Sequence, residues 1–364
     1  MADYDSESRA LDAEILRIIE RWRALGESLG EGAFNDLALR LFEYQLRYNQ
    51  AYARYCARIG VTSAPASWER IPAVPAPAFK EAAIATFESS QAALVFETSG
   101  TTQGRPGRHY MQSAALYDAA LLAGFERFVL GDGARLRYLN LVPNPAERPH
   151  SSLGYMMGRV GAQLGDGRAG WYLRGEALLT DPFERDLNAA VASSQPVCIA
   201  ATAFGLAHLL DVLQQRALRF VLPPASRVME TGGFKGRTRV VERDELYARI
   251  RTVFGLTEDA IFSEYGMTEL TSQYYARASN RAFVAPPWLR VRVVGPDRTT
   301  LPLGEIGSLL HVDLANRSSC VALQTEDIGM MTREGLVFLG RDRDAALRGC
   351  SLDAEQLRTS AASY

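Results

Sequence analysis

A short loop rich in hydroxyl groups and glycine is the part of this sequence whose residue types are best suited to chemistry. Residues 98–102 read Thr-Ser-Gly-Thr-Thr, and Gly104, Arg105, Gly107 and Arg108 follow closely. Small side chains leave backbone N–H groups accessible, the hydroxyls add donors, and the guanidinium groups neutralise an anion. The loop is not a Walker loop, because no lysine follows the glycines at the G-x-x-x-x-G-K-[ST] spacing. The cluster predicts a polyphosphate site, with an ordinary surface turn as the alternative interpretation.

Three further clusters contain acidic side chains at predicted strand ends and turns, and they occupy residues 263–269, 325–329 and 340–344. The first two also contain hydroxyl groups, and the third contains arginines. Glu269 offers Mg²⁺ a hard carboxylate beside the Thr268 hydroxyl, and a nucleotide site needs such a metal because it bridges phosphate oxygens. Asp327 is an acceptor suited to ribose hydroxyls. Taken one at a time, each cluster is read more simply as a solvated acidic turn, so only their combination points to a nucleotide.

The elements that must position these clusters begin with two apolar stripes at helical spacing. They predict one helix over residues 11–25 and a second over residues 34–55. Alternating prolines rule out a helix in residues 71–77, because proline lacks an N–H donor and restricts the residue before it. We therefore expect a rigid extended strap there and a boundary near residue 70, with residues 1–70 as an N-terminal helical segment.

Strand-like and helix-like runs alternate in the central part of the chain. Runs at 136–142 and 197–201 are typical of strands, and runs at 153–164 and 204–218 are typical of helices. This βαβ order favours helices packed on a largely parallel sheet. Short alternating runs between Gly, Pro and Asp turns follow. The sequence therefore predicts an α/β core over residues 71–285 and a smaller β-rich subdomain with a short tail over residues 286–364.

The composition restricts the class of protein. The 364 residues are 47% hydrophobic and 23% charged, which is typical of a globular protein. The formal net charge is −2 and the arginines are scattered among acidic residues, so nucleic-acid binding is not expected. The acidic N-terminus and the lack of a run of about 18 apolar residues argue against a targeting signal or a membrane span. We therefore expect a cytoplasmic protein.

The cysteines and histidines show no spacing of a metal site. No C-x-x-C pair occurs among the four cysteines, so neither a disulfide framework nor a zinc site is expected. Cys198 lies in an apolar run and is predicted to be a core residue. Three histidines lack metal-ligand spacing and receive no role: His109, His208 and His311.

In their order along the chain, the four clusters resemble the core motifs of the adenylate-forming (acyl-activating) superfamily: its phosphate loop, Y-G-x-T-E, T-G-D and G-R-x-D. The match spans roughly residues 92–350. Within that superfamily the chain most resembles the acyl-protein synthetase (LuxE) family, the fatty-acid-activating component of bacterial fatty acid reductase systems. That narrower resemblance rests on residues 71–80, 151–156, 231–236 and 348–352.

This resemblance implies an α/β fold like the N-terminal domain of adenylate-forming enzymes, with parallel-rich sheets and flanking helices. Because the sequence ends shortly after Cys350, it also implies that the full mobile C-terminal domain, which carries a catalytic lysine in full-length members, is absent. The sequence departs from the superfamily pattern at Glu326, where a glycine is usual, and in the phosphate loop, where arginine replaces lysine.

The resemblance also implies roles for individual residues. Thr268 and Glu269 would face the α-phosphate and Mg²⁺. His150 and Met267 would line the acyl pocket together with Gly233, although His150 serves equally well as a structural cap of the following helix. The nucleotide contacts that the resemblance implies, from the phosphates through the adenine to the ribose, are Ser99, Gly100, Thr101, Thr102, Gly232, Gly233, Tyr265, Gly266, Asp327 and Arg341.

Two further residues carry hypotheses about catalysis. Lys235 is our candidate for the cation that replaces the missing lysine, with a solvated loop lysine as the alternative. In the acyl-protein synthetase family a cysteine near the C-terminus receives the acyl group as a thioester, and Cys350 is the cysteine at that place. Nearby positive charge, from Arg341, Arg343 and Arg348, would lower the pKa of its thiol. An inert thiol is the alternative.

The implied activity is ATP- and Mg²⁺-dependent activation of a carboxylic acid, expected to be a fatty acid, as an acyl-adenylate. The acyl group would then move to Cys350 and on to a partner such as an acyl reductase, an acyltransferase or a carrier protein. A close alternative is a ligase that delivers the acyl group to coenzyme A or a carrier-protein thiol. An alternative from another class is a non-catalytic subunit that keeps the fold for assembly.

Overall fold

Residues 2–98, 105–232 and 242–341 are described by the computed structural model of the chain. The chain divides into two units. The first unit comprises Met1–Ala123, Met267–Gln273 and Val284–Tyr364, and the second comprises Gly124–Gly266 and Tyr274–Phe283. The chain therefore passes from one unit to the other inside the Y-G-x-T-E motif, between Gly266 and Met267. The boundaries near residues 70 and 285 remain sequence predictions.

A six-stranded sheet forms the centre of the second unit as the structure describes it, in the order β11-β10-β9-β8-β4-β5. The first five strands along the chain run parallel, and β11 is antiparallel at one edge. β8 is apolar at nearly every position because both faces of a parallel sheet are covered by helices. The strands are β4 (Leu136–Leu141), β5 (Gly165–Trp171), β8 (Val197–Thr202), β9 (Arg227–Thr231), β10 (Ile261–Tyr265) and β11 (Tyr274–Arg277).

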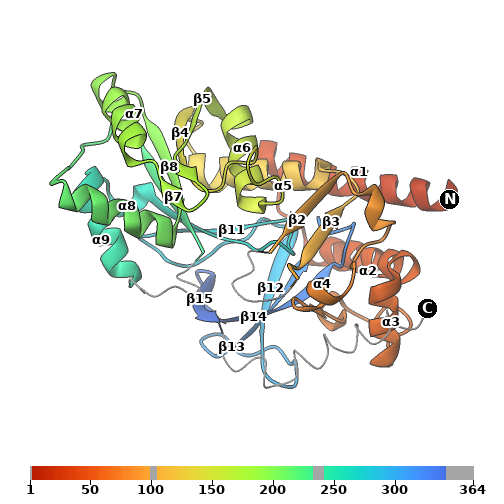
Figure 1. Cartoon of the computed structure of the whole chain (residues 1–364). Coiled ribbons are helices and arrows are strands. Elements are labelled where there is room, and N and C mark those ends of the chain that lie inside the picture. The colour runs from red at the N-terminus through yellow and green to blue at the C-terminus, as the bar shows by residue number, and fades with distance from the viewer. Residues whose placement is uncertain (1, 99–104, 233–241, 342–364) are drawn as a thin grey trace. The chain divides into compact units, whose positions relative to one another are not determined.

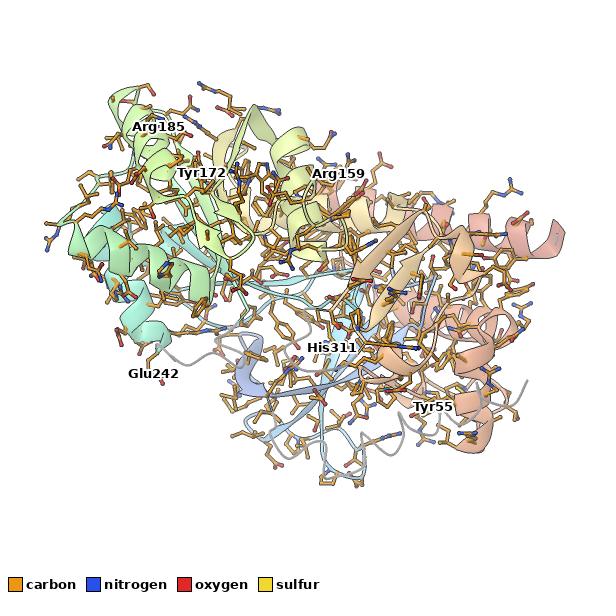
Figure 2. The ribbon with its side chains drawn as sticks, in the orientation of Figure 1. Tyr55, Arg159, Tyr172, Arg185, Glu242 and His311 are labelled. Carbon is orange, nitrogen blue, oxygen red and sulfur yellow. The ribbon has the colours of Figure 1, made fainter. Side chains whose placement is uncertain are left out.

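Helices cover this sheet as the βαβ order predicts, which confirms the α/β class. α7 (Thr180–Ala192), α8 (Ala203–Gln215) and α9 (Arg243–Phe254) share one apolar core with alternate residues of the strands, and α6 (Ser152–Leu164) packs on β4 and β5 (Figure 1). Tyr172, labelled in Figure 2, donates its hydroxyl to Asp186 of α7 at 2.6 Å. The shorter elements of this unit are η3 (Glu126–Leu130), β6 (Leu173–Arg174), β7 (Ala177–Leu178) and η4 (Glu258–Ala260).

The first unit opens with helices. The first predicted helix begins earlier than expected, at Ala2, and the second is divided in the structure. The stripe over residues 34–55 forms two helices, because Asn49 leaves the helical conformation and its side chain accepts a hydrogen bond from the backbone of Tyr52 at 3.0 Å. The helices and short turns before residue 92 are α1 (Ala2–Leu25), α2 (Glu31–Tyr48), α3 (Gln50–Arg58), η1 (Trp68–Arg70), α4 (Ala78–Glu81) and η2 (Ser89–Gln91). α5 (Ala115–Phe125) leads the chain into the second unit.

A second sheet lies in the first unit, and its strands are β1 (Val74–Pro75), β12 (Leu289–Val294), β13 (Ile306–Asp313), β14 (Ala322–Met331) and β15 (Leu336–Arg341). The proline strap is extended as predicted, since β1 pairs in parallel with β14. A sheet edge accommodates proline because the missing N–H is not needed there. Tyr55, labelled in Figure 2, fixes the strap by donating to the carbonyl of Ala73 at 3.1 Å. None of the described helices combines the length and apolarity needed to cross a bilayer.

A buried ion pair attaches α1 to the loop between β13 and β14. Arg317 is 2% exposed, and two of its nitrogens donate to the two carboxylate oxygens of Asp12, each at 2.7 Å. Its third nitrogen donates to Gln112 at 2.9 Å. All three nitrogens of the guanidinium group are therefore satisfied inside the protein.

Replacing Asp12 by alanine should lower the free energy of unfolding by about 3–5 kcal/mol, because the variant leaves a buried guanidinium without its counter-charge. Urea denaturation measures the change. Glu20→Ala, at an exposed position of the same helix, is the control, and its effect should stay within about 0.5 kcal/mol. Equal effects of the two substitutions would show that the ion pair does not stabilise the fold.

Candidate active site

The predicted phosphate loop is framed by a two-stranded hairpin of the first unit, β2 (Leu94–Glu97) and β3 (Arg108–Met111). Two hydrogen bonds join Thr98 and Gly107 at the base of this loop. The Thr98 backbone N–H donates to the carbonyl of Gly107 at 2.9 Å, and the Gly107 N–H donates to the Thr98 hydroxyl at 2.9 Å. The predicted contacts Ser99, Gly100, Thr101 and Thr102 lie outside the described residues. The loop thus starts at a strand end, as predicted.

The Thr268–Glu269 segment is held against this hairpin. His109 of β3 is fully buried, and its Nδ1 lies 2.8 Å from the carbonyl oxygen of Thr268. The Thr268 hydroxyl lies 3.5 Å from the carbonyl oxygen of Glu97, the last residue of β2. The structure therefore places Thr268, from one predicted motif, at the base of the phosphate loop, which is another predicted motif.

Glu269 and the turn after it are fixed by residues that the sequence did not indicate. Asn316 donates its side-chain amide to the carbonyl of Glu269 at 3.0 Å. Asp313, at the end of β13, accepts from the backbone N–H groups of Thr271 at 3.0 Å and Ser272 at 2.8 Å. Burial raises the pKa of the Asp313 carboxyl to about 6. His109, Asn316 and Asp313 carry no motif or spacing that sequence reasoning could have used.

Asp327 and Arg341 come together in the first unit, as the resemblance implies. They are register partners on β14 and β15, and Arg341 Nε lies 3.3 Å from Asp327 Oδ1. The interpretation of residues 325–329 as a solvated turn is wrong, because they belong to β14 and Asp327 is 2% exposed. The side chain of Arg341 is half-exposed and also lies 3.6 Å from Glu326. A buried carboxylate beside a half-exposed guanidinium is suited to binding a group with neighbouring hydroxyls.

The second unit brings another two motifs together at the ends of β9 and β10. The Thr231 hydroxyl donates to the carboxylate of Glu264 on the neighbouring strand. Gly232 follows with a positive φ of 72°, and, apart from its chain neighbours, no described residue lies within 4 Å of the place where a Cβ atom would stand. Tyr265 packs its ring on Tyr274, with centroids 5.6 Å apart, and Gly266 follows it. Gly233 and Lys235 lie outside the described residues.

The two proposed acyl-pocket residues differ in their exposure to solvent. Met267 is half-buried and is the first residue of its segment in the first unit, whereas His150 is exposed. The helix-cap alternative for His150 is wrong, because Ser151 is the N-cap of α6 and accepts from the Gly154 N–H at 3.1 Å. Both acyl-pocket assignments therefore remain predictions.

The described cysteines are unsuited to act as nucleophiles. Cys56, Cys198 and Cys320 are all fully buried, which confirms that Cys198 is a core residue. Burial raises the pKa of the Cys56 and Cys198 thiols to about 12 and raises that of Cys320 as well. A protonated, enclosed thiol does not attack an acyl group. Cys350 lies outside the described residues.

The residues present fit a magnesium ion of the kind that accompanies a nucleotide. Within the described ranges no three His, Cys, Asp or Glu side chains gather as a protein-only metal cage. Mg²⁺ needs no such cage when phosphate oxygens and water complete its coordination, and one or two carboxylates suffice. Glu269 would supply that carboxylate, and its backbone carbonyl accepts a hydrogen bond from Asn316.

His109 should make stability depend on pH. Burial lowers the pKa of its imidazole to about 4, whereas an exposed histidine titrates near 6.5. Below about pH 6.5 the unfolded chain therefore binds a proton at this histidine, whereas the folded protein does not. Acid thus favours the unfolded state. Between pH 8 and pH 5, His109→Asn should lose about 2 kcal/mol less stability than the wild-type protein.

Urea denaturation of both proteins across this range measures the difference. The titration of Asp313 has the opposite effect on stability, but both proteins contain Asp313, so its contribution cancels. Parallel stability curves would contradict a buried neutral His109.

Comparison with known proteins shows which enzymes the chain is similar to in sequence and in fold. No protein-family profile matches the chain. Over 341 residues the chain is 22% identical to the long-chain-fatty-acid–luciferin-component ligase of Vibrio harveyi, covering 88% of this chain and 86% of that protein. The open conformation of 2-hydroxyisobutyryl-CoA ligase, in complex with 2-HIB-AMP and CoA, matches with a TM-score of 0.64 and 16% identity over 86% of this chain and 70% of that one.

ATP-bound MatB from Rhodopseudomonas palustris matches with a TM-score of 0.52 and 17% identity, over 71% of this chain and 50% of that one. The fold is therefore that of the adenylate-forming ligases. By sequence the chain is similar to the Vibrio harveyi ligase, and it shares its fold with the two solved ligases.

Proposed function

We propose that this protein uses ATP to convert a carboxylic acid, expected to be a fatty acid, into an acyl-adenylate and then transfers the acyl group to Cys350. The observation that carries the proposal is the attachment of Thr268 to both strands of the phosphate-loop hairpin, through Glu97 and His109. A reaction of this kind depends on alignment and on neutralisation of phosphate charge more than on covalent chemistry by the protein.

In the first step a carboxylate oxygen attacks the α-phosphorus of ATP. The P–O bond to the β-phosphate breaks, and pyrophosphate leaves with the bonding electrons. The hydroxyls and N–H groups of Ser99, Thr101 and Thr102 are proposed to hold the β- and γ-phosphates. Glu269 would hold Mg²⁺, which neutralises phosphate charge when bound, and Thr268 would face the α-phosphate.

The remaining nucleotide contacts divide between the ribose and the base. Asp327 is proposed to accept from the ribose hydroxyls, and Arg341, which lies beside its carboxylate, is proposed to bind the ribose as well. Gly232 and Gly233 would lie along the adenine and the acyl group, where a missing side chain permits close approach. Tyr265 and Gly266 would complete the base site, and His150 and Met267 would border the acid.

In the second step the thiolate of Cys350 attacks the acyl carbonyl carbon. The bond between that carbon and the phosphate oxygen breaks, and AMP leaves. The thioester keeps the acyl group activated for a partner protein, for which an acyl reductase, an acyltransferase or a carrier protein are the proposed classes. The sequence relative named as a long-chain-fatty-acid ligase supports the choice of a fatty acid.

The test is the exchange of labelled pyrophosphate into ATP, measured with a panel of carboxylic acids that includes short, aromatic and long-chain members. We expect exchange that requires Mg²⁺ and is fastest with long-chain acids. A fast acid other than a fatty acid would change the substrate class. No exchange with any acid would favour the non-catalytic subunit, and exchange without a protein-bound adduct would favour delivery to coenzyme A.

A further inference from the structure

We propose that His109 is a positioning residue, which fixes the Thr268–Glu269 segment on the phosphate-loop hairpin by donating its Nδ1–H to the carbonyl of Thr268. The inference rests on the proposed function, because it assigns to His109 the alignment of two groups that the proposed reaction needs. His109 touches no nucleotide atom in this scheme and acts through Thr268.

The contact with Thr268 determines which ring nitrogen of His109 carries the proton. The Thr268 carbonyl only accepts, and it lies 2.8 Å from Nδ1, so Nδ1 carries the proton. Nε2 is then the unprotonated nitrogen, and it is buried. Burial keeps the pKa of the ring low, so this neutral tautomer persists at neutral pH. The ring of Phe79 packs edge-on at a centroid distance of 5.9 Å and restricts its rotation.

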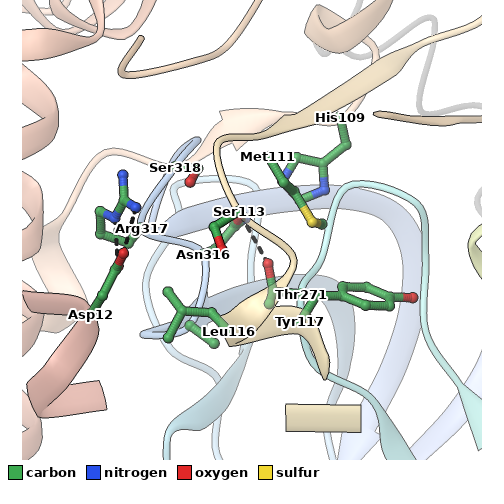
Figure 3. A pocket seen from close by; sticks show the side chains of 11 residues that line it. Asp12, His109, Met111, Ser113, Leu116, Tyr117, Thr271, Asn316, Arg317 and Ser318 are labelled. Carbon is green, nitrogen blue, oxygen red and sulfur yellow. Dashed lines mark hydrogen bonds and ion pairs between the residues drawn. The ribbon is translucent and has the colours of Figure 1, made fainter. Parts of the chain in front are cut away.

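The contact is one of two on consecutive carbonyls. His109 binds the carbonyl of Thr268, and Asn316 binds the carbonyl of Glu269 at 3.0 Å. Figure 3 shows His109 and Asn316 lining the same small cavity, with Thr271 hydrogen-bonded to Asn316 at 3.2 Å. The two peptide groups that carry the Thr268 and Glu269 side chains are therefore fixed by side chains from separate parts of the first unit.

The position of His109 gives the contact its consequence. His109 pairs with Phe96 across the hairpin, and Gly107, only two residues before it, closes the base of the phosphate loop with Thr98. A rigid connection thus runs from the base of the loop to Thr268. Loss of such a connection misplaces reacting groups, and a displacement of about 1 Å can cost on the order of 100-fold in rate.

Three variants separate positioning from packing. His109→Leu removes the donor while keeping an apolar side chain. His109→Asn retains an N–H at the place of Nδ1. Met111→Ala truncates a buried side chain of the same strand that lines the same cavity, and it leaves the His109 contact untouched.

The first measurement is acid-dependent pyrophosphate exchange per folded molecule, at a temperature where all variants are folded. We expect His109→Leu to lower turnover about 10- to 100-fold, with His109→Asn and Met111→Ala within about threefold of the wild-type protein. The second measurement is amide hydrogen exchange of residues 267–273 in the absence of nucleotide, which should accelerate in His109→Leu and not in Met111→Ala.

Wild-type turnover in His109→Leu, or equal damage in His109→Leu and His109→Asn, would overturn the inference. If the leucine variant does not fold, His109→Gln replaces it, since its amide N–H lies at the place of Nε2 and should not restore the contact. The amide measurement does not depend on catalysis. Absence of exchange activity in the wild-type protein would therefore reject the proposed function alone, and unchanged amide protection would reject the role of His109 alone.

Discussion

Cys350→Ser should abolish the acyl adduct that forms on the protein with ATP, Mg²⁺ and a fatty acid. Acid-dependent pyrophosphate exchange should stay within about twofold, because the cysteine enters only after the adenylate exists. A thioester is cleaved by neutral hydroxylamine, whereas a serine ester resists it, and a thiolate is a far better nucleophile than a neutral hydroxyl. Intact-protein mass spectrometry before and after hydroxylamine measures the adduct.

The matched control is Cys56→Ala, which removes a cysteine that is fully buried and whose pKa is raised to about 12. This variant should keep the full adduct. A labile adduct that survives in Cys350→Ser would move the acceptor to another residue. Exchange without any adduct in the wild-type protein would instead make a free thiol, such as coenzyme A, the acceptor.

Glu269→Gln should lower the rate of pyrophosphate exchange about 100- to 1000-fold and raise the Mg²⁺ concentration needed for half-maximal activity. The substitution keeps the shape of the side chain and removes the charge that would hold the metal, and loss of one group that stabilises developing charge costs about 3–4 kcal/mol. The backbone carbonyl of Glu269 is the group that binds Asn316, so the segment should keep its conformation.

Glu305→Gln, the same chemical change at an exposed position of the first unit, is the control and should leave exchange unchanged. Steady-state exchange over a range of Mg²⁺ concentrations separates metal affinity from turnover. A Glu269→Gln protein with wild-type exchange and wild-type Mg²⁺ dependence would remove this residue from the site.

Local patterns in the sequence were sufficient to predict many of the helices and strands and to show the order of the motifs. Apolar runs predicted strands such as β4 and β8 with nearly their observed bounds, and the alternating prolines predicted the strap that forms β1. These features depend on residues close together in the chain. The break at Asn49 was missed because both flanking helices continue one apolar stripe across it.

The supporting residues of the site could not be predicted, for a physical reason. Whether Asp327 is solvated or buried depends on the pairing of β14 with its neighbours, which residue types alone do not reveal. The contact between His109 and Thr268 joins residues 159 positions apart, and its donor is a ring nitrogen with no spacing signature. Motifs thus indicated the groups that are proposed to contact the ligand, and only the fold revealed the residues that hold those motifs in place.

Both units are discontinuous in sequence, since the chain crosses from one to the other after Ala123, Gly266, Gln273 and Phe283. A polypeptide cut at any of these places would separate stretches that belong to one hydrophobic core, so neither half of the gene encodes a free-standing domain. Exchange of modules between homologues by a single crossover would split a unit in the same way. Chimeras of this protein therefore need paired junctions, with residues 267–273 transferred together with the first unit rather than with the strands beside them.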